Sequence, residues 1–223
     1  YFKGRSKNTK KIIKNYANRL EKKFPNKIKL RCYKTPEEVD RAITDADSIA
    51  AQTYQRRIGV SLKDTPELRS KWNFLAKNGW LRVYVLYLEG KPCAFWSGVV
   101  YRNSYVSVFT GFDPDLSYYH PGQHLLIRMI QTFCANGQVK QIWFGQGEAD
   151  YKRRFSNTCA TQLDIFLFSP KFKGQRLRWT KASIKVVSNF AKKILTRLNI
   201  SQKLKKHSRQ GFFSPFKTIE KKI

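Results

Sequence analysis

The stretch from Ser104 to Gly137 constrains the fold of this chain more than any other. Its first part, Ser104–Phe112, alternates aromatic and β-branched residues, which predicts a β-strand. A proline-containing loop, Asp113–Pro121, leads to a helix that begins at Gly122 and ends at Gly137, a C-cap signal. A helix that begins on a glycine presents unpaired N–H groups and a positive dipole end, which bind phosphate or diphosphate groups. An ordinary strand-to-helix connection is the alternative interpretation.

The segments before this stretch predict three helices and an antiparallel meander. The helices are expected over residues 7–24, from Thr35 to about residue 57, and from Thr65 to residue 77, the last two beginning with Thr-Pro-Glu. A short strand is expected over residues 28–32. The meander consists of residues 81–88, 92–102 and 104–112, which are separated by turn signals.

The segments after the central helix predict a parallel crossover and a basic extension. We expect a buried strand over residues 141–144, a helix over 149–155, a last strand over 161–168, and a basic amphipathic helix from Gly174 to about Leu198. This element order predicts an α/β fold with a mixed sheet.

The charge distribution divides the chain into three parts. The net charge is +29; residues 1–27 contain ten Lys and Arg against Glu21, and residues 171–223 contain sixteen against Glu220. Residues 28–170 are nearly balanced, with eighteen basic and thirteen acidic residues. We therefore predict a central domain, 28–170, between two basic arms. Such arms attract polyanions: an anionic membrane surface, nucleic acid or an acidic carrier protein.

The cysteines and apolar runs predict a cytoplasmic protein. The four cysteines are widely spaced and include no Cys-x-x-Cys pair, which favours reduced, buried thiols. No apolar run has the length of a membrane span, and no signal peptide is visible. The sequence starts at Tyr1 and its only methionine is Met129, which leaves room for an upstream domain.

A set of local motifs resembles a known enzyme superfamily. The motifs are Gly111-Phe112-Asp113-Pro114, Tyr119, Pro121-Gly122, Leu125-Leu126, Phe144-Gly145-Gln146-Gly147 and Tyr151-Lys152-Arg153-Arg154-Phe155. With the element order, they resemble the GNAT acyl-CoA N-acyltransferase superfamily, and within it the cellulose-biosynthesis-type, Fem-like acetyltransferases. The basic opening Ser6–Leu20 is similar to the first helix of that subfamily, so the resemblance extends roughly from Ser6 to Phe168.

The resemblance implies a donor site for acyl-CoA, in the first instance acetyl-CoA, on the central stretch. The backbone amides that would bind the CoA diphosphate are those of His120, Gly122, Gln123 and His124. The strand edge that would pair with the pantetheine arm consists of Val108, Phe109, Thr110 and Gly111. A tyrosine on the helix after the next strand often protonates the departing thiolate in this superfamily, and Tyr151 lies at that place.

Two departures from the family pattern leave the donor open. The Arg/Gln-x-x-Gly-x-Gly/Ala signature of the superfamily has Tyr119 and His124 at its outer positions here. The Fem-like motif has Trp143, Gln146 and Asp150 where Asp, Arg and Pro are expected. An acyl carrier protein or an aminoacyl-tRNA is therefore an alternative to free acyl-CoA.

The remaining candidate residues follow from the chemistry of acyl transfer. Attack of an amine on a thioester needs a base for the amine and a proton for the thiolate. Glu148 and Asp150 are candidate bases; alternatively, they are first-turn acids that complement a helix dipole. The candidate acceptor contacts are Trp96, Tyr101, Gly145, Gly147, Lys152 and Arg154. Core packing is the alternative for the aromatic residues and a solvated surface for the cations.

The two histidines near the helix start are candidate bases or phosphate donors. His120 and His124 are four residues apart, as in a metal pair, but Pro121 and Gly122 intervene and no third ligand is evident. We therefore predict no metal site. The sequence also contains no motif typical of hydrolases, NTPases, zincins or dinucleotide-binding proteins.

These observations predict an N-acyltransferase that moves an acyl group from acyl-CoA to an amine, for example on a cell-envelope or polysaccharide precursor. Residues 174–209 would dock on anionic lipid at the inner face of the membrane. A second interpretation is a Fem-type aminoacyltransferase whose basic arms bind tRNA. A third is a non-catalytic module that binds nucleic acid or membranes. The concentration of basic residues outside the domain, and the lack of a recognised nucleic-acid-binding motif, argue against the nucleic-acid version.

Overall fold

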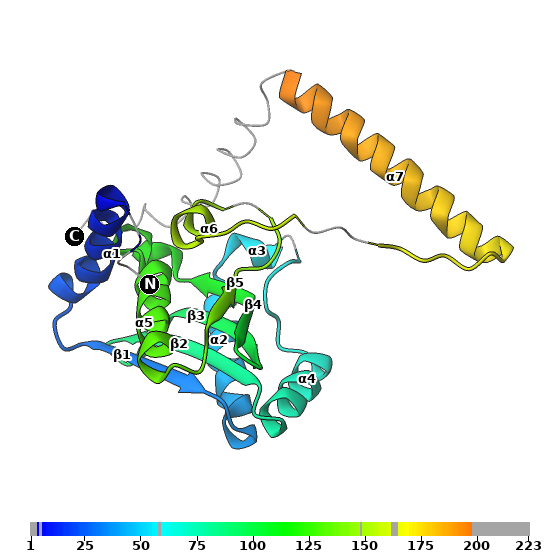
Figure 1. The fold of residues 1–223 in the computed structure, drawn as a ribbon. Helices are drawn as coiled ribbons and strands as arrows, with labels where there is room; N and C mark the ends of the chain where they lie inside the picture. The colour runs from blue at the N-terminus through cyan, green and yellow to red at the C-terminus, as the bar shows by residue number, and fades with distance from the viewer. Residues whose placement is uncertain (1–3, 5, 58, 148, 162–164, 198–223) are drawn as a thin grey trace, which may run out of the picture. The chain divides into compact units, whose positions relative to one another are not determined.

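The computed structural model describes residues 4, 6–57, 59–147, 149–161 and 165–197. The chain divides into two units, Tyr1–Ala160 and Thr161–Ile223. The first unit contains a five-stranded sheet with helices on both faces (Figure 1). The predicted α/β class with a mixed sheet is confirmed.

The five strands lie in the sheet in chain order. They are β1 (Ile28–Tyr33), β2 (Leu81–Leu88), β3 (Lys91–Tyr101), β4 (Ser104–Phe112) and β5 (Gln141–Trp143). The first four pair antiparallel, whereas β4 and β5 pair parallel. The connection between β4 and β5 contains the 3-10 helix η2 (Pro114–Tyr119) and helix α5 (Pro121–Asn136), which is the predicted crossover.

Strand β2 is buried on both faces and divides the core into two layers. Tyr84, Leu86 and Leu88 face one layer, and Val83 and Val85 face the other. The period of two follows from the alternation of side chains along a strand. The near-continuous apolar run of β2 is therefore the pattern of a strand covered on both sides.

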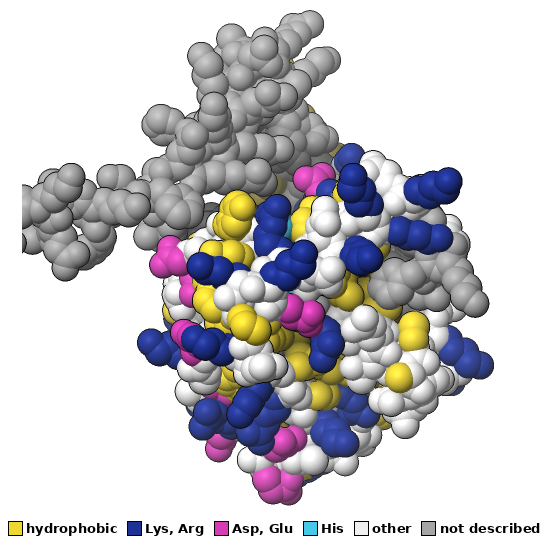
Figure 2. All heavy atoms as spheres, turned by 90° about the vertical axis from the view of Figure 1, so that its left-hand side faces the viewer, with side chains coloured by type: hydrophobic (Ala, Val, Ile, Leu, Met, Phe, Trp, Pro, Cys, Tyr) yellow, Lys and Arg dark blue, Asp and Glu magenta, His cyan; other side chains and the backbone are white. Residues whose placement is uncertain are grey.

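The first layer contains α1 (Lys7–Lys23), α5 and α6 (Asp150–Phe155). Helix α1 begins at Ser6, whose hydroxyl accepts from the Thr9 N–H, and it buries Ile13 and Leu20. Helix α5 ends at Gly137 in the left-handed conformation, as predicted. Figure 1 shows α1 beside α5 in front of the sheet. Figure 2 views the α1 side and shows Lys and Arg side chains spread across it.

The second layer is built from η1 (Pro36–Glu38), α2 (Val39–Ala51), α3 (Tyr54–Arg57) and α4 (Pro66–Lys77). The prediction of one helix from Thr35 to about residue 57 is wrong, because α2 ends at Ala51. The Thr53 hydroxyl donates to the Ala50 carbonyl, and Arg56 donates to Asp47 and to the Leu62 carbonyl. These side-chain bonds compete with continuation of the helix.

Buried polar groups attach α2 to the sheet. The Asp45 carboxylate is buried and accepts from the Tyr33 hydroxyl at 2.6 Å, from the Tyr87 hydroxyl, and from Arg41 Nε at 3.1 Å. Two tyrosines from neighbouring strands therefore converge on one carboxylate from the covering helix. Because each partner is hydrogen-bonded, the desolvation cost of the carboxylate is offset.

Three expectations near the C-terminal end are corrected. Strand β5 is partly exposed instead of buried. The expected strand 161–168 is absent at the described residues 161 and 165–168, where Leu167 is 94% exposed and has no strand to pair with. Residues 162–164 lie outside the described part of the chain. The C-terminal helix α7 runs from Phe172 to Arg197, starting two residues earlier than predicted.

Two further observations concern the cysteines and the membrane. All four cysteines are free; Cys93 is buried, but Cys134 and Cys159 are exposed. Among the residues that the structure describes, no helix combines the length and apolarity that crossing a bilayer requires.

Candidate functional site

Strands β4 and β5 separate after three residue pairs. Ser104, Tyr105 and Val106 of β4 face Gln141–Trp143 of β5, and the ladder ends there. Strand β4 continues to Phe112 along β3. Between Ser107 and Phe112, therefore, β4 has no strand on its β5 side in the described part of the chain. This opening contains the four residues that the sequence predicted as a pantetheine-binding edge.

The backbone groups of Thr110 point into the opening. The Phe109 N–H donates to Ser97 Oγ on β3, and the Asp113 N–H donates to the Cys93 carbonyl on the same side. Backbone groups alternate in direction along a regular strand, so those of Thr110 point away from β3. The pairing of β3 with β4 shifts at Val108, which has no partner of its own on β3, so this alternation does not extend to Val108. Phe109 and Gly111 therefore belong to the edge by position, but their N–H groups face β3. A ladder of backbone donors and acceptors at alternate residues can bind an extended chain that contains amides.

Gly145 and Gly147 form the loop that leaves β5 at the apex of the opening. Both have positive φ angles, 75° and 83°, and a Cβ on Gly145 would lie 3.7 Å from the Ser107 carbonyl oxygen. Lys152 Nζ donates to the carbonyls of Gly145 and Gln146 at 3.1 and 2.6 Å. Desolvation lowers the pKa of Lys152. This lysine therefore holds the loop, which is a different role from the acceptor contact predicted for it.

Tyr151 lies in an aromatic cluster beside the same apex. Its ring makes edge contacts with Trp96 and Phe144, at centroid distances of 5.6 and 6.0 Å. Trp96 is buried, and its Nε1–H donates to Ser107 Oγ at 2.7 Å. Among the described residues the Tyr151 hydroxyl has no hydrogen-bond partner, and burial raises the pKa of this tyrosine. A protonated phenol with a free hydroxyl is therefore placed next to the open edge of β4.

Of the two acidic candidates, Asp150 and Glu148, the structure describes only Asp150. Asp150 is exposed in the first turn of α6, a position that also suits an acid complementing the helix dipole. Glu148 lies outside the described residues.

The start of α5 offers fewer free amides than the sequence predicted. His120 is the N-cap in the left-handed conformation, with φ 53°, and its N–H donates to the Ser117 carbonyl. The N–H groups of Gln123 and His124 both donate to the His120 carbonyl at 3.0 Å. Pro121 has no N–H. At the start of α5, from residue 120 to 124, only the Gly122 amide is therefore unpaired among the described residues. The predicted cradle of four amides is thus reduced to one unpaired amide in the described part of the chain, since those of Gln123 and His124 share the His120 carbonyl.

Side chains also occupy part of this corner. A Cβ on Gly122 would lie 3.3 Å from the Phe112 ring, so the glycine allows close packing against β4. The Gln123 side-chain oxygen is buried and has no hydrogen-bond partner in the described part of the chain. It is an unsatisfied acceptor at the first turn of α5.

Two arginines lie near the start of α5. Arg19 of α1 donates to the Tyr118 carbonyl at 3.0 Å, and Arg154 of α6 donates to the Tyr16 hydroxyl at 2.8 Å. The Tyr16 ring contacts the His120 ring at 4.5 Å between centroids. The pKa of His120 is lowered, first by burial and then by the positive charges of Arg19 and Arg154.

We call Arg19 and Arg154 the arginine pair. Among the described residues, neither forms an ion pair with a carboxylate. They come from helices that are far apart in sequence but meet at the start of α5. Together with the positive end of the helix dipole, they create an uncompensated site for an anion.

His124 faces α1 and not the start of α5. Its side chain is buried, with Nδ1 at 2.9 Å from the Ala17 carbonyl and Nε2 at 3.8 Å from Glu21. Burial lowers the pKa of His124. The structure thus places this side chain where it stabilises the packing of α1 on α5, away from the predicted phosphate contact.

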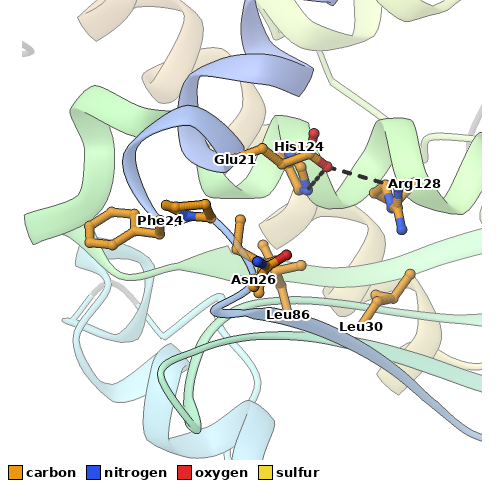
Figure 3. A pocket seen from close by; sticks show the side chains of 9 residues that line it. Glu21, Phe24, Asn26, Leu30, Leu86, His124 and Arg128 are labelled. Atoms are coloured by element: carbon orange, nitrogen blue, oxygen red, sulfur yellow. Dashed lines mark ion pairs between the residues drawn. The ribbon is translucent and has the colours of Figure 1, made fainter.

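A cavity of about 340 Å³ lies beside His124 (Figure 3). Apolar side chains, including Phe24, Leu30 and Leu86, line it, and Glu21 lies at its edge near His124 and Arg128. The Glu21 carboxylate is 3.9 Å from Arg128, so the two charges compensate each other. The cavity is separate from the β4 opening and contains no residue of the predicted site except His124.

Tyr101 is not brought to the site. It lies at the end of β3, half-exposed, where its ring contacts Trp80 at 5.3 Å. It is five residues from Trp96 along the strand, which corresponds to about 16 Å at roughly 3.3 Å per residue. Among the described residues, no three His, Cys, Asp or Glu side chains lie together as metal ligands.

The sequence did not reveal Tyr16, Arg19, Ser107 or Phe144 as site residues. Tyr16 is part of the apolar face of α1, and its contact with α6 spans 138 residues of sequence. No local pattern encodes such a contact. Ser107 and Phe144 could have been found from the expected crossover, because they follow the paired part of each strand.

Comparisons with known proteins agree with this architecture. Residues 7–153 match the family of acetyltransferase (GNAT) domains. A comparison with curated protein sequences finds no match.

Several solved structures are similar to this chain. An aminoglycoside acetyltransferase, meta-AAC0020 from an uncultured soil metagenomic sample in complex with sisomicin, has 14% identity and a TM-score of 0.47, covering 66% of this chain and 98% of that one. A GCN5-related N-acetyltransferase from Ralstonia eutropha JMP134 has 14% identity and a TM-score of 0.44, covering 63% and 98%. A GNAT family acetyltransferase from Staphylococcus aureus has 11% identity and a TM-score of 0.46, covering 63% and 99%.

These identities and TM-scores say nothing about the substrate of this chain. The family match is to the GNAT domain as a class and does not distinguish a Fem-like subfamily. It covers more than half of the chain and includes the whole sheet with its β4–α5–β5 crossover. The protein therefore belongs to the GNAT acetyltransferase domain family.

Proposed function

We propose that this protein transfers an acyl group, in the first instance acetyl, from acyl-CoA to an amine acceptor. The observation that carries the proposal is the opening between β4 and β5, because Tyr151, whose hydroxyl has no hydrogen-bond partner among the described residues, contacts Trp96, which pairs with Thr110 of β4. The donor supplies a thioester whose carbonyl carbon is attacked by the amine. A C–N bond forms and the C–S bond breaks, so the thiolate needs a proton and the amine loses one.

The open edge of β4 fits the pantetheine part of the donor. This part is extended and contains amides, and the backbone groups of Thr110 point into the opening, next to the irregular pairing at Val108. Val108 is 47% exposed, so its edge is accessible. We infer that these two residues bind the arm in the manner of an added strand.

The start of α5 fits the diphosphate. Gly122 contributes one free amide, and the arginine pair contributes the charge that the reduced cradle does not supply. Charge-assisted hydrogen bonds from guanidinium groups to phosphate are stronger than those from neutral donors. Diphosphate binding here would therefore depend on side chains of α1 and α6 more than the sequence pattern indicated.

Tyr151 is the proposed proton donor to the thiolate. Because burial raises its pKa, the phenol stays protonated throughout the neutral range. Asp150, with Glu148 as the second candidate, is the proposed acceptor of the amine proton, directly or through water. Trp96 and Phe144 hold the Tyr151 ring by edge contacts and exclude water from one side of it.

The acceptor proposed from the sequence is an amine of a cell-envelope or polysaccharide precursor. An assay of CoA release with acetyl-CoA and a panel of amino sugars, aminoglycosides, diamines and peptides tests both halves of the proposal. We expect acetyl-CoA to raise the melting temperature, because a ligand that binds only the folded state stabilises it. We also expect at least one amine to accelerate CoA release.

Two results would contradict the proposal. One is an unchanged melting temperature with acetyl-CoA, longer acyl-CoA and CoA. The other is a rise in melting temperature with charged or uncharged tRNA but none with any CoA compound, which would favour the aminoacyl-tRNA alternative.

A further inference from the structure

Helix α7 is long, continuous and basic throughout. It contains 26 residues, Phe172–Arg197. At 1.5 Å per residue it is about 39 Å long. From Lys171 to Arg197 the chain contains nine Lys and Arg residues and no Asp or Glu. A helix of this composition has no acidic side chain with which its own cations can pair.

Four large apolar residues of α7 lie on one side of the helix. They follow each other at spacings of seven, seven and four residues, and we call them the α7 stripe: Phe172, Trp179, Val186 and Phe190. At 100° per residue these four positions fall within an arc of about 40°. Their exposed fractions are 78%, 70%, 68% and 66%, respectively.

The cations of α7 are placed around this stripe. Arg176 lies about 60° from the centre of the stripe, Arg178 and Lys173 about 100° and 120°, and Lys181 about 160°; all four are exposed. The helix thus presents an exposed apolar stripe with three aromatic residues, and its described cations lie outside this stripe. Leu177 and Ile184, at an interval of seven residues, lie about 140° to 160° from the centre of the stripe, among the cations, and are also exposed.

We propose that α7 docks on an anionic lipid surface, with the α7 stripe at the boundary between headgroups and acyl chains. The occupant is argued from two complementary features. The cations match the negative surface potential of anionic lipids, which attracts Lys and Arg side chains near the surface. The aromatic and aliphatic stripe matches the apolar depth that a helix reaches when it lies in the interface plane.

A nucleic acid would match only one of these features. Phosphate groups explain the charge of α7, but a polyanion in water does not cover an apolar stripe of four residues. An anionic lipid surface matches both features, because the stripe can reach the acyl boundary while the cations stay at the headgroups. Docking of α7 would keep the first unit near amines that are attached to membrane-bound carriers. This inference is independent of the proposed reaction, because it uses no residue of Tyr1–Ala160.

The test uses the whole chain and two variants of equal charge. In the stripe variant, Trp179→Glu and Phe190→Glu lower the net charge by two; in the charge-matched variant, Arg178→Gln and Lys181→Gln do the same. Binding is measured by flotation with vesicles of phosphatidylcholine alone and with vesicles that also contain phosphatidylglycerol. Transfer RNA in the same buffer is the competing probe.

We expect the unaltered chain to float with the phosphatidylglycerol vesicles and not with phosphatidylcholine alone. The stripe variant should bind them at least about tenfold more weakly, because each aromatic side chain contributes apolar burial. The charge-matched variant should lose less vesicle binding than the stripe variant does. The difference in binding between the charge-matched variant and the unaltered chain should shrink at high salt. Vesicles should also shift the tryptophan emission to the blue, and Trp179→Phe should remove this shift while binding persists.

Three results would overturn the inference. The first is equal vesicle binding by the stripe variant and the unaltered chain. The second is binding to transfer RNA with no binding to either vesicle. The third is a lower melting temperature of the stripe variant in the absence of lipid, which would show that the stripe covers protein surface instead.

Discussion

Individual side chains at Tyr151 and at the start of α5 lie at the two ends of the open edge of β4. The Tyr151 ring is held by Trp96 and Phe144, whereas its hydroxyl stays free among the described residues. The arginine pair lies at the other end of the opening, where η2 leads into α5. In the proposed function Tyr151 serves the chemical step and the arginine pair serves donor binding, so each role can be tested by its own substitution.

Replacement of Tyr151 by Phe should reduce turnover and leave donor binding almost unchanged. The ring contacts with Trp96 and Phe144 persist in the variant, and only the proton donor is lost. Because general acid catalysis contributes about a hundredfold or more, we expect kcat to fall by that factor. Steady-state kinetics and the acetyl-CoA melting shift measure the two effects.

Tyr101→Phe is the matched control for Tyr151→Phe. Tyr101 is half-exposed and packs against Trp80, away from the opening, so its variant should keep the kcat of the unaltered chain. If Tyr151→Phe keeps that kcat as well, the hydroxyl has no role as the acid.

Replacement of Arg154 by Gln should weaken donor binding more than turnover. The guanidinium has no carboxylate partner among the described residues, so its positive charge is available to a phosphate group. A charge-assisted bond contributes enough for KM of acetyl-CoA to rise about tenfold. The difference between the variant and the unaltered chain should shrink at high salt.

Arg128→Gln provides the comparison for Arg154→Gln. Arg128 is also half-exposed and lies on α5, but it is directed to Glu21 at the separate cavity. An equal rise in KM for both variants would mean that general surface charge, and not the arginine pair, binds the donor.

At the scale of helices and strands, the sequence predicted the elements better than the contacts between them. The alternation in β4 and the Pro and Gly signals at the two ends of α5 are local, so strand, helix and crossover could be predicted. The strand expected over 161–168 had a suitable pattern, but its described residues, 161 and 165–168, pair with no strand, and local patterns do not report pairing. The hydrogen bonds that occupy the α5 amides depend on the left-handed His120, which its residue type does not indicate.

The packing of α1 on α5 should weaken in acid. The pKa of His124 is lowered from 6.5 by burial, so the unfolded chain binds more protons than the folded chain below that value. Stability should therefore fall as the pH decreases through about 6.5 toward the lower folded pKa. His120, whose pKa is lowered too, contributes in the same direction.

Denaturant unfolding between about pH 7 and pH 5 measures this dependence. In His124→Asn the amide can still donate to the Ala17 carbonyl, but it does not titrate. We expect this variant to show a smaller loss of stability on acidification. A variant with the same or a steeper loss would show that His124 is not the titrating group.

The attachment of α2 to the sheet should depend on Asp45. Asp45→Ala removes the carboxylate on which Tyr33, Tyr87 and Arg41 converge. Leaving buried hydroxyls without an acceptor should lower the free energy of unfolding by about 3 kcal/mol. Asp40→Ala in the same helix removes an exposed ion pair with Arg69 and should cost less than about 1 kcal/mol. Equal losses in the two variants would contradict the assigned role of the network.

At the scale of the whole molecule, the basic helix α7 and the proposed catalytic residue Tyr151 lie in different parts of the chain. The GNAT match ends at residue 153, and the β4 opening with Tyr151 lies within the matched range. Of the described cations, Arg19 of α1 lies at the proposed donor site, while those of α7 belong to the second unit. The composition of the sequence predicted that basic arms flank a balanced domain, but it could not show that α1 reaches the start of α5.

The central claim is that a thioester donor binds along the free edge of β4 next to Tyr151. Amide hydrogen exchange with and without saturating acetyl-CoA tests it most directly, because it reports on the backbone groups of the edge. We expect slower exchange in residues 107–112 and at Gly122 when the donor is bound, and unchanged exchange in β1, which borders the separate cavity. Slower exchange in β1 with none in residues 107–112 would contradict the account.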